Sequence, residues 1–295
     1  MADNTVLLRR GLDSAVVNLF GADVTSWKVA GLEMLFLSKL ARFDRKTAIR
    51  GGIPIVFPHF GPWESGPNHG FARVHEWTVK EAPHETGDGD VTASLSLMHG
   101  PSTREFWDYR FEAVYRVTLK QGELVLDLQV TNEDDIPFSF TTLLHPYFLV
   151  PRVQDCEVSG CKGSYYIDKV HNCTDCQEQR DTIRVTGPID NVYKKTEKSI
   201  TLKNAAGGRT ILITKENLPD TGLLSIPALC PCLLLYINVT HVRVINISMA
   251  RIGIVMANIR FFLFRFFHSI RGQYCSIFGQ QHGLFQEPEF QGKNE

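Results

Sequence analysis

The sequence lacks an excess of charge of either sign. Its 31 lysine and arginine residues almost equal its 32 aspartate and glutamate residues, which leaves a formal net charge of -1 at pH 7. A protein that binds nucleic acid needs a basic surface to meet the phosphates. We therefore expect no nucleic-acid partner, and an anionic ligand would have to be held by a few local arginines.

The amino terminus lacks the features of a secretory signal. Residues 1–5 (MADNT) contain neither a basic segment nor the start of an apolar one, so we expect a cytoplasmic protein. The seven cysteines all lie at or after Cys156, an odd number at irregular spacing, which is not a secreted disulfide framework. We expect reduced thiols. Cys173 and Cys176 form one close pair of zinc-type ligands, but a zinc site needs a second pair, so no metal is expected.

Acidic residues are missing from one long part of the chain. Residues 222–286 contain no aspartate or glutamate, and they include apolar runs over 223–239 and 252–267. Both runs are short for a bilayer span, and the second contains two arginines. We interpret residues 222–295 as an atypical apolar tail that arises from a variant splice or reading frame. A membrane anchor is the alternative interpretation, and we do not favour it.

Alternation of apolar and polar residues dominates the first 221 residues. Residues 91–97 place valine, alanine and leucine on one face and threonine and serine on the other, as in a half-buried strand. Residues 111–119 and 124–130 repeat this pattern around Gln121-Gly122, which predicts a hairpin. Long helical periods are absent. The pattern predicts an all-β protein, a large antiparallel β-sandwich over residues 1–221.

The segment from Arg50 to Gly61 (RGGIPIVFPHFG), followed by Asn68 to Arg73 (NHGFAR), gathers polar groups around glycine-rich backbone. Glycine lets the backbone approach a ligand closely, and proline restricts φ. The two arginines can each form paired hydrogen bonds with a phosphate or carboxylate. These residues predict a site for a small polar anion.

These two segments, with Leu144 to Phe148 (LHPYF), Ile189 to Tyr193 (IDNVY) and Lys215 to Thr221 (KENLPDT), resemble the hexose-6-phosphate mutarotases. These proteins, also called glucose-6-phosphate 1-epimerases, belong to the aldose 1-epimerase superfamily. The resemblance covers about residues 5–221. It implies a supersandwich fold with a sugar cleft on the face of one sheet. It also implies an isomerase that exchanges the α and β anomers of a hexose 6-phosphate by opening the ring, which requires one acid and one base but no cofactor.

The resemblance also implies roles for individual residues. His145 matches the catalytic acid, and a histidine suits this role because its ordinary pKa lies near neutral pH. Arg50 and Arg73 match the arginines that hold the substrate phosphate. The residues that position the sugar would be Asn68, His69 and Asp190. Asn68 stands where glutamine is usual, and Asn191 stands where arginine is often found.

The resemblance ends before the strand that carries the family's catalytic base, a glutamate. Glu287 and Glu289 flank a proline, a context that suits an exposed turn. We therefore expect this chain to epimerise its substrate poorly. The alternative function is a non-catalytic carbohydrate-binding protein that keeps the sugar cleft. In either case we expect a monomer whose partner is a small sugar.

Overall fold

The described chain is built almost wholly from β-strands. The computed structural model describes residues 4–225, 232–244 and 257–264. These residues form three antiparallel sheets and four short helices. The helices are η1 (Ala72–Val74), α1 (Pro101–Arg104), η2 (Val153–Asp155) and η3 (Ala206–Gly208). None of the helices in the described part of the chain is long and apolar enough to cross a bilayer.

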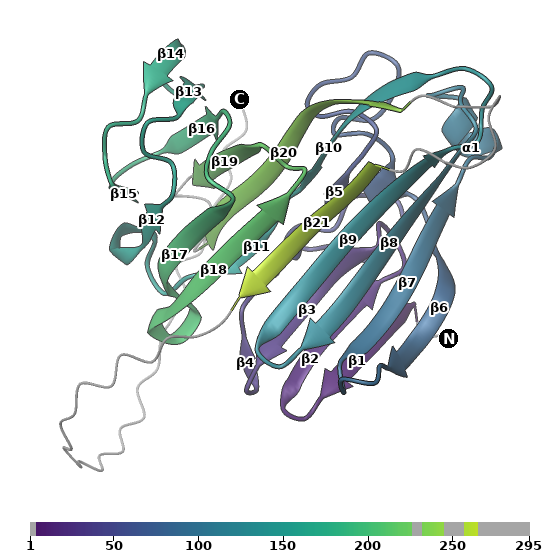
Figure 1. Ribbon diagram of the computed structural model, residues 1–295, viewed down its shortest axis with the longest axis horizontal. Helices are drawn as coiled ribbons and strands as arrows, with labels where there is room; N and C mark the ends of the chain where they lie inside the picture. Colours follow the sequence, from purple (N-terminus) through teal and green to yellow (C-terminus); the bar gives the residue numbers. More distant parts are fainter. Residues whose placement is uncertain (1–3, 226–231, 245–256, 265–295) are drawn as a thin grey trace, which may run out of the picture.

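One layer of the molecule is a nine-stranded sheet, which lies in front in Figure 1. From edge to edge its strands are β15 (Thr182–Arg184), β12 (Glu157–Ser159), β17 (Ser199–Ala205), β18 (Arg209–Glu216), β21 (Ala257–Phe264), β9 (Glu123–Asn132), β8 (Phe111–Lys120), β7 (Val91–Met98) and β6 (Thr78–Glu85).

The other layer consists of two smaller sheets. The eight-stranded sheet runs in the order β14 (Cys173–Gln177), β13 (Tyr165–Asp168), β16 (Ile189–Tyr193), β19 (Asp220–Ser225), β20 (Cys232–Val244), β10 (Phe138–Leu144) and β5 (Ile55–Val56), with β11 (Tyr147–Leu149) paired to β20. The four-stranded sheet consists of β1 (Thr5–Arg10), β2 (Asp13–Asn18), β3 (Asp23–Val29) and β4 (Leu32–Glu33). Its first two strands pack against the nine-stranded sheet.

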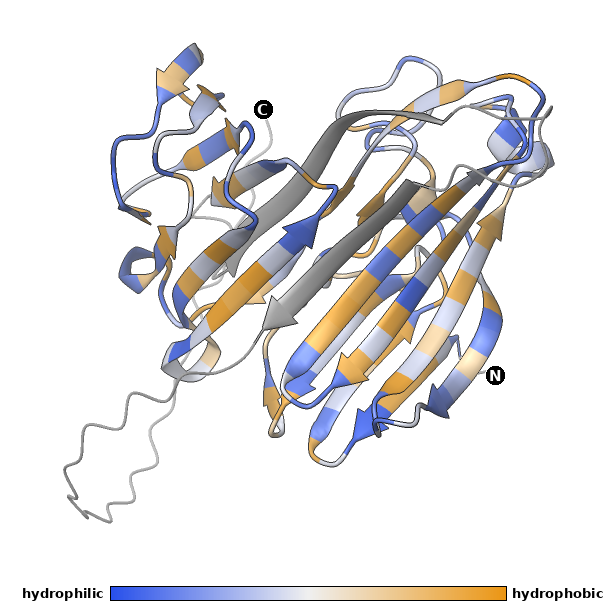
Figure 2. Cartoon of the chain, viewed as in Figure 1, coloured by the Kyte–Doolittle hydropathy of each residue, from blue (hydrophilic) through white to orange (hydrophobic). Residues whose placement is uncertain are grey.

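The core lies between these layers. It is filled by the apolar side chains that alternate with polar ones along the strands. On β8 and β9 every second side chain is buried, which Figure 2 shows as alternating hydrophobic and hydrophilic bands. The two strands pair from Phe111 opposite Asn132 to Lys120 opposite Glu123, so the turn is Gln121-Gly122 as predicted. The predicted all-β, antiparallel β-sandwich is confirmed.

Strands continue past the predicted end of the sandwich domain. β19 runs through Thr221 to Ser225, and β20 pairs with both β19 and β10. β21 lies between β18 and β9 in the middle of the nine-stranded sheet (Figure 1). Segments 232–244 and 257–264 therefore contribute strands to both layers. The origin of residues 222–295 from a variant splice or reading frame stays a prediction.

The expectation of reduced thiols is wrong for one pair of cysteines. Cys173 and Cys176 form a disulfide within β14, with their Cα atoms 6.1 Å apart. The pairing with β13 is irregular here, since Cys176 lies opposite Tyr166 and Cys173 opposite Asp168. This bulge inserts one extra residue between the cysteines, a local backbone change that spacing alone does not reveal. Elsewhere in the described part of the chain, Cys156 and Cys161 are buried free thiols.

Candidate active site

Two adjacent glycines determine the backbone conformation at the predicted anion site. Gly51 and Gly52 have φ values of 123° and 67°. A Cβ atom at Gly52 would lie 2.5 Å from Oδ1 of Asp23 and 2.6 Å from the carbonyl oxygen of Val24. The next residue, Ile53, donates its backbone N–H to the same carboxylate at 2.8 Å. Only glycine fits this close approach of the loop to β3, and the loop places Arg50 at its amino-terminal end.

Three of the predicted residues line one cavity of about 520 Å³. Arg50, Arg73 and His145 lie in its wall, together with Tyr147. They come from three places in the chain: the glycine loop, η1, and the connection between β10 and β11. Because β10 pairs with β5, the end of β10 lies beside the segment that follows the glycines, and the backbone N–H of His145 donates to the carbonyl of Pro54 at 3.1 Å.

Arg73 is positioned to receive an anion. Its Nη2 donates to the backbone carbonyl of Asn68 at 2.7 Å, which holds the side chain in place. Its Nε is buried and has no hydrogen-bond partner among the described residues. Burial also lowers the pKa of Arg73, because little water solvates its charge. An anionic oxygen in the cavity would satisfy both the unpaired N–H and the buried charge.

The two predicted histidines form one unit at the edge of the cavity. Their ring centroids lie 6.3 Å apart. Nδ1 of His69 accepts a hydrogen bond from the backbone N–H of Gly61 at 3.1 Å, so its Nε2 carries the hydrogen of the neutral ring. The same ring stacks on Phe60 at 5.4 Å. His69 can therefore donate to a sugar hydroxyl from a fixed orientation, as the resemblance implies.

Both histidines are neutral at pH 7 in the absence of ligand. Burial, with smaller contributions from His69, Arg73 and Lys169, lowers the pKa of His145 to about 3. Burial lowers the pKa of His69 to about 4, with contributions from Arg73 and Lys169. A general acid must carry its proton when the reaction begins. His145 therefore needs a negative charge nearby before it can act as the acid.

Lys169 is a candidate site residue that no sequence pattern indicates. Its Nζ lies 3.6 Å from Oδ1 of Asp190 and 5.5 Å from the ring centroid of Phe60, the ring on which His69 stacks. The pairing of β13 with β16 brings Lys169 and Asp190 together, and the backbone N–H of Lys169 donates to the carbonyl of Asp190. A single lysine after a strand gives no sequence signal, so only the strand pairing reveals it.

The predicted residues thus fall into two groups. Arg50, Arg73 and His145 share the cavity, and His69 adjoins it through its contact with His145. Asp190 lies beside Lys169, whereas Asn68 is exposed and contacts Arg73 through its backbone carbonyl. Among the described residues, none that lines the cavity is acidic. Glu287 and Glu289 lie outside the described residues.

Comparisons with known proteins show which family the chain belongs to. The family described as aldose 1-epimerase matches residues 4–223. A relative from Cenchrus ciliaris, provisionally named glucose-6-phosphate 1-epimerase, is 36% identical over 213 residues, which are 70% of this chain and 65% of the relative. A relative of the same provisional name from Escherichia coli is 36% identical over 68% of this chain and 66% of its own length. The chain thus spans slightly less than two thirds of the length of these curated relatives.

Solved structures show the same fold. The crystal structure of a provisionally named mutarotase from Salmonella typhimurium superposes with a TM-score of 0.75 at 25% identity and covers 87% of this chain and 88% of that protein. A protein from Synechocystis superposes with a TM-score of 0.76 at 20% identity, over 88% of this chain and 94% of that protein. By the family match over residues 4–223, this chain belongs to the aldose 1-epimerase family.

Proposed function

We propose that the protein is a hexose-6-phosphate 1-epimerase that exchanges the α and β anomers of glucose 6-phosphate. The observation that carries the proposal is the buried guanidinium of Arg73, whose Nε has no hydrogen-bond partner among the described residues, in one cavity with Arg50 and His145. The cavity volume of about 520 Å³ suits a small ligand. The provisional names of the curated relatives support the same substrate.

The phosphate would do more than hold the substrate. A phosphate ester carries between one and two negative charges near neutral pH. Beside Arg73 it offsets the positive charge that helps to keep His145 neutral. Substrate binding would therefore raise the pKa of His145 toward neutral pH. The acid would be charged only when the cleft holds its substrate.

The reaction then needs one proton transfer in each direction. His145 donates a proton to the ring oxygen, a base removes the proton of the C1 hydroxyl, and the bond between C1 and the ring oxygen breaks. Rotation about the C1–C2 bond and reversal of these steps give the other anomer. His69 and Asp190 orient the sugar hydroxyls. The described residues supply the acid and the sugar contacts, and the base is not assigned.

A second candidate function is a carbohydrate-binding protein without catalysis. It is favoured by the cavity lining, which contains no carboxylate among the described residues. The two functions differ in one experiment, which measures binding and anomer exchange of glucose 6-phosphate on the same sample. Exchange NMR should detect faster interconversion in the epimerase, with a loss in His145→Gln. Binding of glucose 6-phosphate with interconversion at the buffer rate would support the carbohydrate-binding protein and overturn the epimerase.

A further inference from the structure

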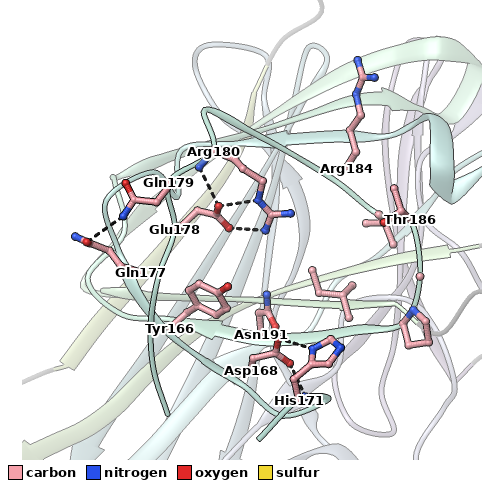
Figure 3. Close-up of a pocket in the computed structure, with 14 residues that line it drawn as sticks. Tyr166, Asp168, His171, Gln177, Glu178, Gln179, Arg180, Arg184, Thr186 and Asn191 are labelled. Carbon is pink, nitrogen blue, oxygen red and sulfur yellow. Dashed lines mark hydrogen bonds and ion pairs between the residues drawn. The ribbon is translucent and has the colours of Figure 1, made fainter. Parts of the chain in front are cut away.

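A second cavity lies on the other face of β16 from the sugar cleft. Successive side chains of a strand point to opposite faces of the sheet, so the side chains of Asp190 and Asn191 lie on different faces. Asp190 contacts Lys169 on the cleft side. Asn191 lines a separate cavity of about 440 Å³, between β13, β16 and the segments 177–180 and 184–189 (Figure 3).

The charged residues that line this cavity are paired within the protein. Glu178 is 2% exposed and accepts two hydrogen bonds from the guanidinium of Arg180, at 2.8 and 2.7 Å. Asp168 contacts His171 at 2.8 Å. Figure 3 shows both pairs. A charged ligand would have to break one of them, so the cavity suits a neutral ligand.

A buried acceptor in the lining has no hydrogen-bond partner in the described part of the chain. The hydroxyl of Tyr193 donates its one hydrogen to Oε2 of Glu178 at 3.0 Å, so it accepts from Nδ2 of Asn191 at 3.1 Å. This fixes which end of the amide is oxygen. Oδ1 of Asn191 is buried and has no hydrogen-bond partner among the described residues, and the side chain is 3% exposed. A buried acceptor without a donor destabilises the folded protein. A ligand that donates a hydrogen bond to this oxygen would remove that penalty, so we expect such a ligand to bind here.

Apart from Arg184, which pairs with Glu157, the remaining lining is uncharged and combines polar groups, apolar side chains and one aromatic ring. Gln177, Gln179 and Thr186 offer amide and hydroxyl groups, and the half-buried ring of Tyr166 offers an apolar face. A sugar combines hydroxyl donors with an apolar face of C–H groups, and aromatic side chains bind such faces well. We infer that this cavity is a second binding site, separate from the cleft, for a neutral polyhydroxylated ligand of monosaccharide size. This inference does not depend on the proposed function.

The test is hydrogen exchange of the full chain with methyl glucopyranoside, a neutral sugar whose C1 hydroxyl is blocked. Millimolar sugar should slow exchange of backbone amides within residues 177–187, which lie beside this cavity and not beside the cleft. The sugar concentration needed for this protection reports the affinity. Asn191→Leu should weaken that affinity by about tenfold, the effect of one lost hydrogen bond. The control variant Thr174→Ala, at an exposed position of β14 that lines neither cavity, should keep the affinity within about twofold.

A second pair of variants keeps the test valid if Asn191→Leu does not fold, which circular dichroism will show. Tyr166→Ala removes the ring and should also weaken protection by about tenfold, whereas Tyr166→Phe keeps the ring and should retain protection. Three results would each overturn the inference. They are protection confined to residues 50–73, no protection by millimolar sugar, and equal protection in the wild type and the folded variants Asn191→Leu or Tyr166→Ala.

Discussion

The imidazole rings of His69 and His145 lie 6.3 Å apart at the edge of the cavity that Arg73 lines. In this arrangement the pKa of His145 falls to about 3 and that of His69 to about 4, mainly because the surrounding protein keeps water away from the two half-buried rings. Both are therefore uncharged at neutral pH before a ligand binds. The cavity offers donor groups to an anionic sugar, and in the proposed reaction His145 would become protonated only when a negatively charged substrate enters.

The first prediction is proton uptake on ligand binding. Glucose 6-sulfate is a useful probe because its sulfate does not titrate near neutral pH. At about pH 6 the free histidines are deprotonated, and the bound anion should raise their pKa, so binding should take up protons. Calorimetry in buffers of different ionisation enthalpy measures this uptake. His145→Gln should take up fewer protons, and proton release or equal uptake in the variant would contradict the mechanism.

The second prediction is that Arg73 determines the preference for phosphate. Arg73→Ala removes a charge-assisted contact of about 1.5 to 3 kcal/mol, so binding of glucose 6-phosphate should weaken by roughly tenfold to a hundredfold. Free glucose should be affected little. Arg73→Lys keeps the charge without the planar fork and should give an intermediate loss. Calorimetry with both sugars tests this, and equal losses for the two would argue against a phosphate role.

The third prediction concerns Lys169. Its positive charge helps to lower the pKa of His69, so Lys169→Met should raise the pKa of His69 above about 4. Burial is the larger cause and remains, so the pKa should stay below its ordinary value. Lys169→Arg is the control, because it keeps the charge and should leave the titration near that of the wild type. NMR titration of the ring nitrogens is the measurement, and identical titrations in all three proteins would exclude Lys169 from the site.

The fourth prediction links the glycine loop to stability. Burial raises the pKa of Asp23 well above its usual value of 3.8. The folded protein therefore holds a proton that the unfolded chain releases, and this contribution to stability is lost as pH rises from about 4 through the raised pKa. Asp23→Asn cannot ionise but can still accept from the N–H of Ile53. Its free energy of unfolding, relative to wild type, should increase between about pH 4 and pH 8 in urea titrations. A difference that does not change with pH would show that Asp23 is ionised in the folded state.

Local patterns predicted the sheets better than the site. Alternation over residues 111–130 was enough to predict the hairpin of β8 and β9, because a strand with one buried face must alternate. The grouping of Arg50, Arg73 and His145 was predicted through the family resemblance, and the structure places all three in one cavity. No local pattern brings these three segments together. Their meeting depends on the pairing of β5 with β10, a contact between residues far apart in the chain.

What could not be predicted depends on strand register and on bulges. Lys169 contacts Asp190 because β13 pairs with β16. The register of that pair cannot be predicted from the sequence of either strand alone. The disulfide between Cys173 and Cys176 depends on a bulge in β14. The second cavity depends on Asn191 and Tyr193 facing away from Asp190, and the sequence does not say which face of β16 meets the cleft.

The most direct test of the proposed function is exchange NMR between the anomers of glucose 6-phosphate, with the full chain and with His145→Gln. We predict interconversion faster than in buffer alone, with the acceleration lost in His145→Gln while glucose 6-phosphate still binds. Because the base is not assigned, we expect a rate below that of an enzyme with both groups, by up to about a hundred- to ten-thousandfold. Interconversion at the buffer rate in the wild type, or equal acceleration in His145→Gln, would contradict the proposed epimerase with His145 as its acid.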